Sequence, residues 1–428
     1  MAETENGTVE ETGETEENTA RAGQGVAGRE APGVRRLRWA SMAPFFLTGF
    51  VFASYFVQIP VWKTGFGLSE GALGLLLIVP ILTGLVAMQA TGSLVARFGS
   101  APVVRVAALA LPLSLVAFVP PSSAGSVFGF VVVLAVFGAA DGLIDVSMNA
   151  HAIAVEKETG RHIMNSCHAA WSIGSAVGSL LGGAAIKAGL TLTAHYAAVG
   201  AAMVALALVA GRSLLPARTD RVGKAAAGGT KEPDTGTATR AGVLSGWSTR
   251  LLLLGLTGTV VLVCSGVVGN WGGVYLHEKL GATLATASLA YIAYSACEAG
   301  GRLVGDRLHA RFGARALVNR GGAIAVVGLT VVVLAPGPVT AVVGFALFGL
   351  GLSVLVPVIF SSVGHGGDDL DAGSAAHALA KVNTMTYSGL LIGPVLVGWF
   401  AGAFGLRTTL AGLLVLLVVT LAAGLRKV

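Results

Sequence analysis

Twelve predominantly apolar segments, most of them near 20 residues long, constrain the fold of this chain more than any other feature. A helix rises about 1.5 Å per residue, so about 20 residues cross the roughly 30 Å of a bilayer core. The sequence therefore predicts an all-α integral membrane protein with 12 transmembrane helices, and it excludes a soluble enzyme. The predicted segments are about 39–62, 71–94, 102–119, 126–152, 163–186, 191–211, 250–275, 281–304, 316–335, 338–363, 375–404 and 407–425.

A polar stretch divides these segments into two sets of six. We expect a cytoplasmic linker over residues 212–249, between six-helix bundles at 35–211 and 250–428. Residues 1–34 are rich in glutamate, threonine and glycine and contain no apolar run. Such a composition buries too little surface to fold, so we expect a disordered acidic cytoplasmic tail rather than a signal peptide.

The two halves of the chain repeat each other. Ala96-Arg-Phe-Gly99 recurs as Ala310-Arg-Phe-Gly313, 214 residues later. A second set recurs at an offset of 216 residues, where Trp171-Ser172, Gly182 and Gly189-Leu190 correspond to Tyr387-Ser388, Gly398 and Gly405-Leu406. With an even number of segments in each half, such a repeat is parallel and has its axis along the membrane normal.

The basic residues predict the orientation in the membrane. If the amino-terminal tail is cytoplasmic, the cytoplasmic side holds all but four of the 28 Lys and Arg residues. This bias predicts a multi-pass protein of a bacterial-type plasma membrane with both termini in the cytoplasm. The cations are spread over many short loops, which excludes a nucleic-acid partner. The four exceptions are Lys63, Lys187, Lys279 and Arg407.

Short loops after the second and eighth segments resemble the loop motif of the major facilitator superfamily. They read Gly92-Ser-Leu-Val-Ala-Arg-Phe-Gly99 and Gly301-Arg-Leu-Val-Gly-Asp-Arg307. The resemblance implies two pseudo-symmetric six-helix bundles, the major facilitator fold, that rock about a central solute site. Ala96 replaces the acidic residue of the motif in the first copy, whereas the second copy keeps Asp306. A gating ion pair could therefore draw its acid from the second copy only. The gating candidates are Gly92, Arg97, Gly99, Gly301, Arg302, Asp306 and Arg307.

Within that superfamily the chain is similar to bacterial permeases related to the fucose-permease branch. The residues that carry this similarity are Asp145-Val-Ser-Met-Asn149, Glu156, His168, Trp171-Ser172, Asn270-Trp271 and Tyr275-Leu276. Relatives in this branch tend to carry acids in the seventh segment, where this chain has Ser265 and Asn270. That departure argues against proton coupling through the seventh helix.

Ionisable residues inside the apolar segments are the candidates for proton coupling, because a charge at the bilayer centre costs roughly 2.5–3.5 kcal/mol. Asp141 and Asp145 are spaced by four and share a helical stripe with Asn149. Glu298 precedes Arg302 by four residues, so an ion pair on the helix surface is the alternative. His168 is a proton relay or, equally, a buried histidine held by hydrogen bonds. Structural carboxylates bonded to neighbouring helices remain the alternative for both aspartates.

Uncharged polar and aromatic side chains suit a hydroxylated small molecule, since aromatic faces stack on rings and amides bind hydroxyls. Gln58 and Trp62 correspond to Trp271 and Tyr275 at a repeat offset of 213. For Trp62 and Tyr275 the alternative is anchoring at the membrane interface. The candidates for contact with solute are Gln58, Trp62, Asn149, Trp171, Asn270, Trp271, Tyr275, Tyr291, Tyr294, Asn383 and Tyr387.

These features predict a secondary active transporter that moves a small, polar or sugar-like solute by alternating access, with a proton as a possible second substrate. Export of drugs or metabolites, and solute sensing without transport, are the alternatives. An Mg²⁺-dependent transferase using Asp141 and Asp145 is disfavoured, because no further acids and cations face the same pocket. Three isolated cysteines give no disulfide or metal spacing. We expect no cofactor and a monomer in the lipid bilayer.

Overall fold

The computed structural model describes residues 32–160, 163–216, 248–364 and 372–424, and all the regular structure in these ranges is helical. The predicted acidic tail and most of the predicted linker lie outside the described residues. In chain order the helices are α2 (Pro32–Phe56), α3 (Ile59–Gly65), α4 (Glu70–Phe98), α5 (Ser100–Val116), α6 (Val119–Ser123), α7 (Val127–Thr159), α8 (Met164–Lys187), α9 (Leu192–Gly211), α10 (Thr249–Val267), η1 (Val268–Gly272), η2 (Tyr275–Lys279), α11 (Leu284–Ala287), α12 (Leu289–Leu334), α13 (Pro338–Leu352), α14 (Leu355–Gly364), α15 (Ala372–Phe404) and α16 (Leu406–Gly424).

Among the described residues, ten helices are long and apolar enough to cross a membrane, and the bent α15 raises the number to eleven. The predicted span at 281–304 covers α11 and the first part of α12, which are not among them. That part carries Glu298, Arg302 and Arg307, so it is less apolar than the other spans. The all-α membrane fold is confirmed.

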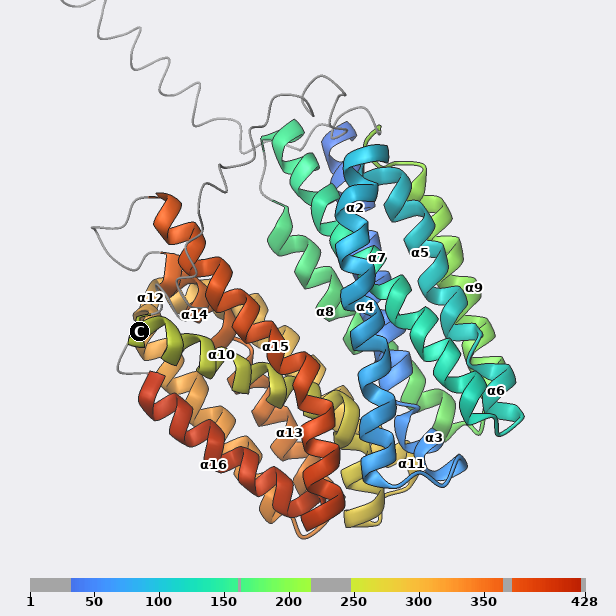
Figure 1. The fold of residues 1–428 in the computed structure, drawn as a ribbon, viewed down its shortest axis with the longest axis vertical. Helices are drawn as coiled ribbons and strands as arrows, with labels where there is room; N and C mark the ends of the chain where they lie inside the picture. The colour runs from blue at the N-terminus through green and yellow to red at the C-terminus, as the bar shows by residue number, and fades with distance from the viewer. Residues whose placement is uncertain (1–31, 161–162, 217–247, 365–371, 425–428) are drawn as a thin grey trace, which may run out of the picture.

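The helices form two bundles (Figure 1). In the first, α2 packs on α8, α4 on α7, and α5 on both α7 and α9. In the second, α12 packs on α13, and α10 packs on α15 and α16. Serine or threonine side chains cap several helix starts, as where Ser69 accepts a hydrogen bond from the backbone N–H of Ala72 at 3.2 Å.

The sequence repeat has the same backbone conformation in both copies. Gly99, which ends α4, has φ 83° and ψ 161°, and its counterpart Gly313, which breaks α12, has φ 77° and ψ 164°. Gly189 and Gly405 of the second repeat also have positive φ, 69° and 81°. Glycine is favoured at these turns because other residues adopt positive φ only with strain. The repeat relates α4 to the first part of α12, and α8 to α15.

The most extensive contacts between the bundles are those of two helix pairs, α4 with α15 and α8 with α12. The repeat exchanges these two pairs, so the interface follows the same pseudo-symmetry as the bundles. At the α4–α15 crossing, a Cβ built on Gly74 would lie 3.0 Å from the Cα of Gly398. In Figure 1 the bundles approach each other around α3 and α11 and spread apart toward the end at which α8 begins.

Small residues let α7 approach α4 closely within the first bundle. A Cβ added to Gly142 would lie 2.2 Å from the carbonyl oxygen of Gly84, and one added to Gly138 would lie 2.0 Å from that of Pro80. Small residues at such crossings allow backbones to approach, which favours packing of membrane helices. The position of α7, and of the acids that it carries, therefore depends on these glycines.

Gly142→Ala is expected to lower the melting temperature of the detergent-solubilised protein by several degrees, because its methyl group meets backbone rather than a flexible side chain. Gly92→Ala is the matched control. Gly92 also lies in α4, but nothing lies within 4 Å of its added Cβ, so this change should not lower stability. Thermal unfolding followed by intrinsic fluorescence measures both. Equal melting temperatures for the two variants would contradict the packing argument.

Candidate functional site

Three buried serines on one stripe of α8 connect the first bundle to α12 of the second. We call Ser172, Ser175 and Ser179 the serine stripe. Ser175 Oγ lies 2.9 Å from the hydroxyl of Tyr291, and Ser179 Oγ lies 3.4 Å from Ser295 Oγ. These contacts, formed between side chains 116 residues apart in sequence, make the α8–α12 interface polar inside the membrane.

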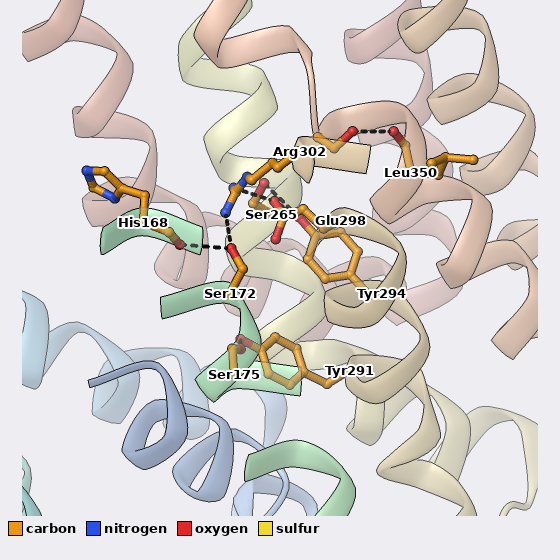
Figure 2. Close-up of polar contacts among 10 residues, drawn as sticks. His168, Ser172, Ser175, Ser265, Tyr291, Tyr294, Glu298, Arg302 and Leu350 are labelled. Atoms are coloured by element: carbon orange, nitrogen blue, oxygen red, sulfur yellow. Dashed lines mark hydrogen bonds and ion pairs between the residues drawn. The ribbon is translucent and has the colours of Figure 1, made fainter. Parts of the chain in front are cut away.

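An ion pair in the second bundle meets the end of this stripe (Figure 2). Arg302 Nη2 donates to Glu298 Oε1 at 2.8 Å, and Arg302 Nη1 donates to Ser172 Oγ at 3.2 Å. The hydroxyl of Tyr294 lies 3.1 Å from Glu298 Oε1 and 3.0 Å from Ser265 Oγ on α10. The predicted ion pair of Glu298 with Arg302 is confirmed. We call Ser265, Tyr294, Glu298 and Arg302 the Glu298 cluster.

The two charges of the cluster differ in their access to solvent. The Glu298 side chain is 11% exposed, whereas that of Arg302 is 38% exposed. Arg302 therefore adds a charge-assisted hydrogen bond to the neutral ones that link α12 to α8. Arg302 was predicted as part of a gating loop, but the structure places it inside α12, bonded to Glu298 and Ser172.

His168 lies one turn before Ser172 on α8, where the bundles begin to separate. Its side chain is exposed, and its ring packs at 5.3 Å on Phe45 of the same bundle. Figure 2 shows the imidazole directed away from Arg302. The alternative of a buried histidine is therefore wrong.

Asp141, Asp145 and Asn149 lie on α7 and are all half-buried. Asn149 Nδ2 donates to the backbone oxygen of Asp145 at 2.8 Å and to its Oδ1 at 3.3 Å. Tyr387 lies on α15 of the second bundle. The Tyr387 side chain is 53% exposed.

Several aromatic candidates lie in the cores of the bundles instead. Trp62 stacks on Phe118 at 5.1 Å, and the hydroxyl of Tyr275 donates to the backbone oxygen of Val332 at 3.0 Å. Both are buried, as is Trp271. Contact with solute and anchoring at the membrane interface are therefore both corrected for Trp62 and Tyr275, because their rings are enclosed by protein.

The amide candidates also have partners within their own bundles. Gln58 Nε2 lies 3.4 Å from His195 Nδ1, and Asn270 Nδ2 donates to the backbone oxygen of Gly266 at 2.8 Å. Trp171 is half-buried and packs against the core. The side chain of Asn383 lies outside the described part of the chain.

The two copies of the loop motif differ in their surroundings. Arg97 is exposed and stacks over the ring of Phe98 at 5.1 Å, and Gly92 has open space around it. Gly301 instead faces Ser353 of the α13–α14 connection, with 2.2 Å between an added Cβ and its Oγ. Arg307 is exposed, and the side chain of Asp306 is outside the described residues. Only Gly99, which has positive φ, behaves as a turn residue.

Two ion pairs that the sequence did not predict join the bundles at the other end of the interface. Lys63 of α3 pairs with Glu278 of η2, and Lys279 Nζ lies 3.3 Å from Glu70 Oε1 of α4. A signal for them exists, because Lys63 and Lys279 are two of the four cations assigned to the outer side. Within the described residues, no group of three or more His, Cys, Asp or Glu is arranged to hold a metal ion.

Comparison with known proteins decides the family. The Major Facilitator Superfamily profile matches residues 6–161 and 45–376. An uncharacterized MFS-type transporter of Yersinia pestis is 31% identical over 385 residues, which cover 90% of this chain and 94% of that protein. This chain belongs to the major facilitator superfamily. It is accordingly an MFS-type transporter, and the polar contacts between its bundles lie within a transporter fold.

Solved structures share this fold at low sequence identity. A bacterial homolog of the human lysosomal transporter Spinster, in an inward-facing and unoccupied conformation, has a TM-score of 0.69 and 15% identity, covering 93% of this chain and 98% of that one. A D-xylose–proton symporter has a TM-score of 0.64 and 16% identity, covering 88% of this chain and 96% of that one. Both support the two-bundle arrangement of this superfamily member.

Proposed function

We propose that this protein is a secondary active transporter that moves a small, polar, sugar-like solute by alternating access, coupled to protons through Asp145. The observation that carries the proposal is the polar contact between the bundles, where Arg302 of the second bundle donates to Ser172 of the first and pairs with Glu298. Ionisable groups inside a membrane protein mark pathways for solutes or protons. When the bundles move relative to each other, the contacts between polar groups on the two bundles must change, so these groups can couple binding to the movement.

The proposed solute site consists of Asp145, Asn149, Ser172, Arg302 and Tyr387. Its carboxylate, amide, hydroxyl and guanidinium groups offer both acceptors and donors to the hydroxyls of a solute. The half-exposed ring of Tyr387 offers an apolar face. This mixture suits a polyhydroxylated molecule better than an apolar drug, as a member of the fucose-permease branch that the sequence resembles would require.

We further propose that the conformation described here is inward-facing. The bundles are joined by ion pairs at the end that carries Lys63, and they separate beyond Ser172, where His168 is exposed. Helix α8 begins at the separated end, on the side that the distribution of basic residues predicts to be cytoplasmic. If both termini are cytoplasmic, solute bound near Tyr387 faces the cytoplasm.

Solute flux into sealed proteoliposomes tests the function. A thermal-shift screen of sugars, polyols, nucleosides and antibiotics first selects ligands, because a compound that binds the native state raises the melting temperature. The selected compound should then cross the membrane chemically unchanged. Ligands found only among apolar drugs would overturn the substrate class, and binding without flux would overturn transport in favour of sensing.

The orientation is tested by cysteine labelling of intact cells. A membrane-impermeant maleimide is expected to label a cysteine placed at Gly337, between α12 and α13, and to miss one at Gly228 in the linker. The positive charges of the linker keep it on the cytoplasmic side. Labelling after permeabilisation is the control for reactivity at Gly228, and the reverse pattern in intact cells would overturn the topology.

A further inference from the structure

The amino-terminal tail and the break in α12 lie on the same side of the membrane. Two membrane spans, at 33–65 and 70–98, lead from the start of α2 to Gly99, so these two points lie on one side. The repeat is parallel and relates Gly99 to Gly313, which places the break in α12 on that side as well. Residues 1–31 therefore leave the first bundle on the side at which α12 is broken.

Arginine side chains gather around one aromatic ring at this break. Cζ of Arg311 lies 5.3 Å from the centroid of the Phe312 ring, and Cζ of Arg320 lies 4.4 Å from it. Arg307 precedes Arg311 by one helical turn on the same face, and all three arginines are exposed. We call Arg307, Arg311 and Arg320 the arginine cluster. Two guanidiniums on one ring lie within about 10 Å of each other, the Debye length at 0.1 M salt, so their charges repel.

The first copy of the repeat shows that the fold does not require this arrangement. Arg97 stacks over Phe98 at 5.1 Å, as Arg311 does over Phe312. Arg105 follows the first copy as Arg320 follows the second, but its Nε donates to the backbone oxygen of Gly211 at 2.8 Å. The first bundle uses this arginine to join α5 to the end of α9. The second guanidinium on the ring is therefore particular to α12.

The tail carries the complementary charge. Seven of its eight glutamates lie in residues 3–17, which contain no lysine or arginine. We call residues 3–17 the acidic block. Residues 302–320 carry five arginines and one acid, Asp306. A guanidinium presents its N–H donors in a fork that matches the two oxygens of a carboxylate, so this surface suits an acidic peptide.

The chain between the acidic block and α2 has a suitable length. Residues 18–31 are rich in glycine and alanine, and a glycine-rich segment of 14 residues has an end-to-end distance of about 20 Å. Helix α2 packs on α8, and α8 packs on α12. Two interaxial spacings of packed helices amount to about 16–20 Å, and full extension of the segment would reach about twice as far. The acidic block can therefore reach α12 from the start of α2.

We propose that the acidic block of the tail docks on the arginine cluster of the same chain. Carboxylates of the block bind the exposed guanidiniums and reduce the repulsion between Arg311 and Arg320. A short tether gives the block a local concentration in the millimolar range, so ion pairs that are weak one by one suffice. Docking of this kind does not depend on transport, so it can be measured whatever the solute is.

Distances between spin labels measure docking in the full chain. Labels are attached to cysteines at Gly13 of the acidic block and at exposed Asn319 of α12, in a background from which the three native cysteines have been removed. We expect a population with a short distance that decreases when salt is raised from about 0.05 M to about 0.5 M, because exposed charges are screened. Arg311→Gln with Arg320→Gln should lower the ratio of docked to undocked chains about fivefold, the size expected for the loss of two exposed ion pairs.

Matched variants separate this contact from a general attraction between the tail and the basic side of the protein. Lys157→Gln with Arg212→Gln removes two exposed bases from the same end of the first bundle and should leave the distances unchanged. Glutamine at Glu10 and Glu11 should lower docking in the parent. The same two changes should have little further effect once the cluster arginines are replaced, because contacting positions are not additive.

A photo-crosslinking residue at position 319 identifies the occupant of the cluster. Mass spectrometry should find it joined to a peptide from residues 1–21. Crosslinks to phospholipid or to another part of the chain alone would give the cluster a different occupant and overturn the proposal. The proposal is also wrong if no short distance exists at low salt, or if the first-bundle variant reduces docking as much as the cluster variant does.

Discussion

Asp145→Asn is expected to abolish accumulation of solute driven by a pH gradient while sparing the exchange of solute between the two sides of the membrane. Asparagine keeps the shape of aspartate and its contact with Asn149, but it does not exchange a proton in the physiological range. Accumulation should fall at least about tenfold, which corresponds to a loss of about 1.4 kcal/mol of coupling. Exchange requires only binding and reorientation of the bundles, so it should change little.

Proteoliposomes with an imposed pH gradient measure accumulation, and counterflow at equal pH measures exchange. Glu158→Gln is the control on the same helix, because Glu158 is exposed at the end of α7. Asp141→Asn should have a smaller effect, since Asp145 is the aspartate whose carboxylate is bonded to Asn149 of the proposed solute site. Undiminished accumulation by Asp145→Asn would remove this residue from proton coupling.

The fold was predictable because its main determinant is local. Runs of apolar residues follow directly from the thickness of the bilayer, and the repeat of Ala96–Gly99 at Ala310–Gly313 required no three-dimensional information. The structure gives that repeat a physical reason, since both copies end in a glycine with positive φ. The exception was the span at 281–304, whose polarity reflects the Glu298 cluster that it carries.

The candidate site was less predictable because the burial of a side chain depends on tertiary packing. Spacing identified the pairing of Glu298 with Arg302, which lie one helical turn apart on the same face. The same reasoning proposed Trp62 and Tyr275 as solute contacts, although neighbouring helices enclose both. An amphipathic ring near a helix end looks the same in sequence whether it faces a pathway, the lipid or the core.

The two ion pairs of Lys63 with Glu278 and of Lys279 with Glu70 show the other limit of sequence reasoning. Lys63 and Glu278 are 215 residues apart, and no local pattern joins them. The distribution of charge did single out Lys63 and Lys279 as exceptions on the outer side of the membrane. A cation that contradicts the overall bias requires a reason, and the acids facing it on the other bundle provide one.

Arg302→Gln is expected to have the largest effect on stability of any single change in the Glu298 cluster. It removes the donor to Ser172 across the bundles and leaves the buried Glu298 carboxylate with Tyr294 as its remaining partner in the cluster. An uncompensated buried group costs about 1–3 kcal/mol, and the partial exposure of Arg302 argues for the lower part of that range. Thermal unfolding in detergent should show a clear decrease, and transport should be lost.

A double variant separates these two effects. Glu298→Gln combined with Arg302→Gln removes the uncompensated charge, so it should regain most of the lost stability, with a coupling energy of about 0.5–3 kcal/mol between the two positions. Transport should not return, because the guanidinium of the proposed solute site is still absent. Arg315→Gln, an exposed arginine in the second part of α12, is the matched control and should retain both properties. If Arg302→Gln unfolds at the same temperature as the parent, the ion pair is not a structural link between the bundles; if it also transports solute normally, Arg302 has no part in the solute site.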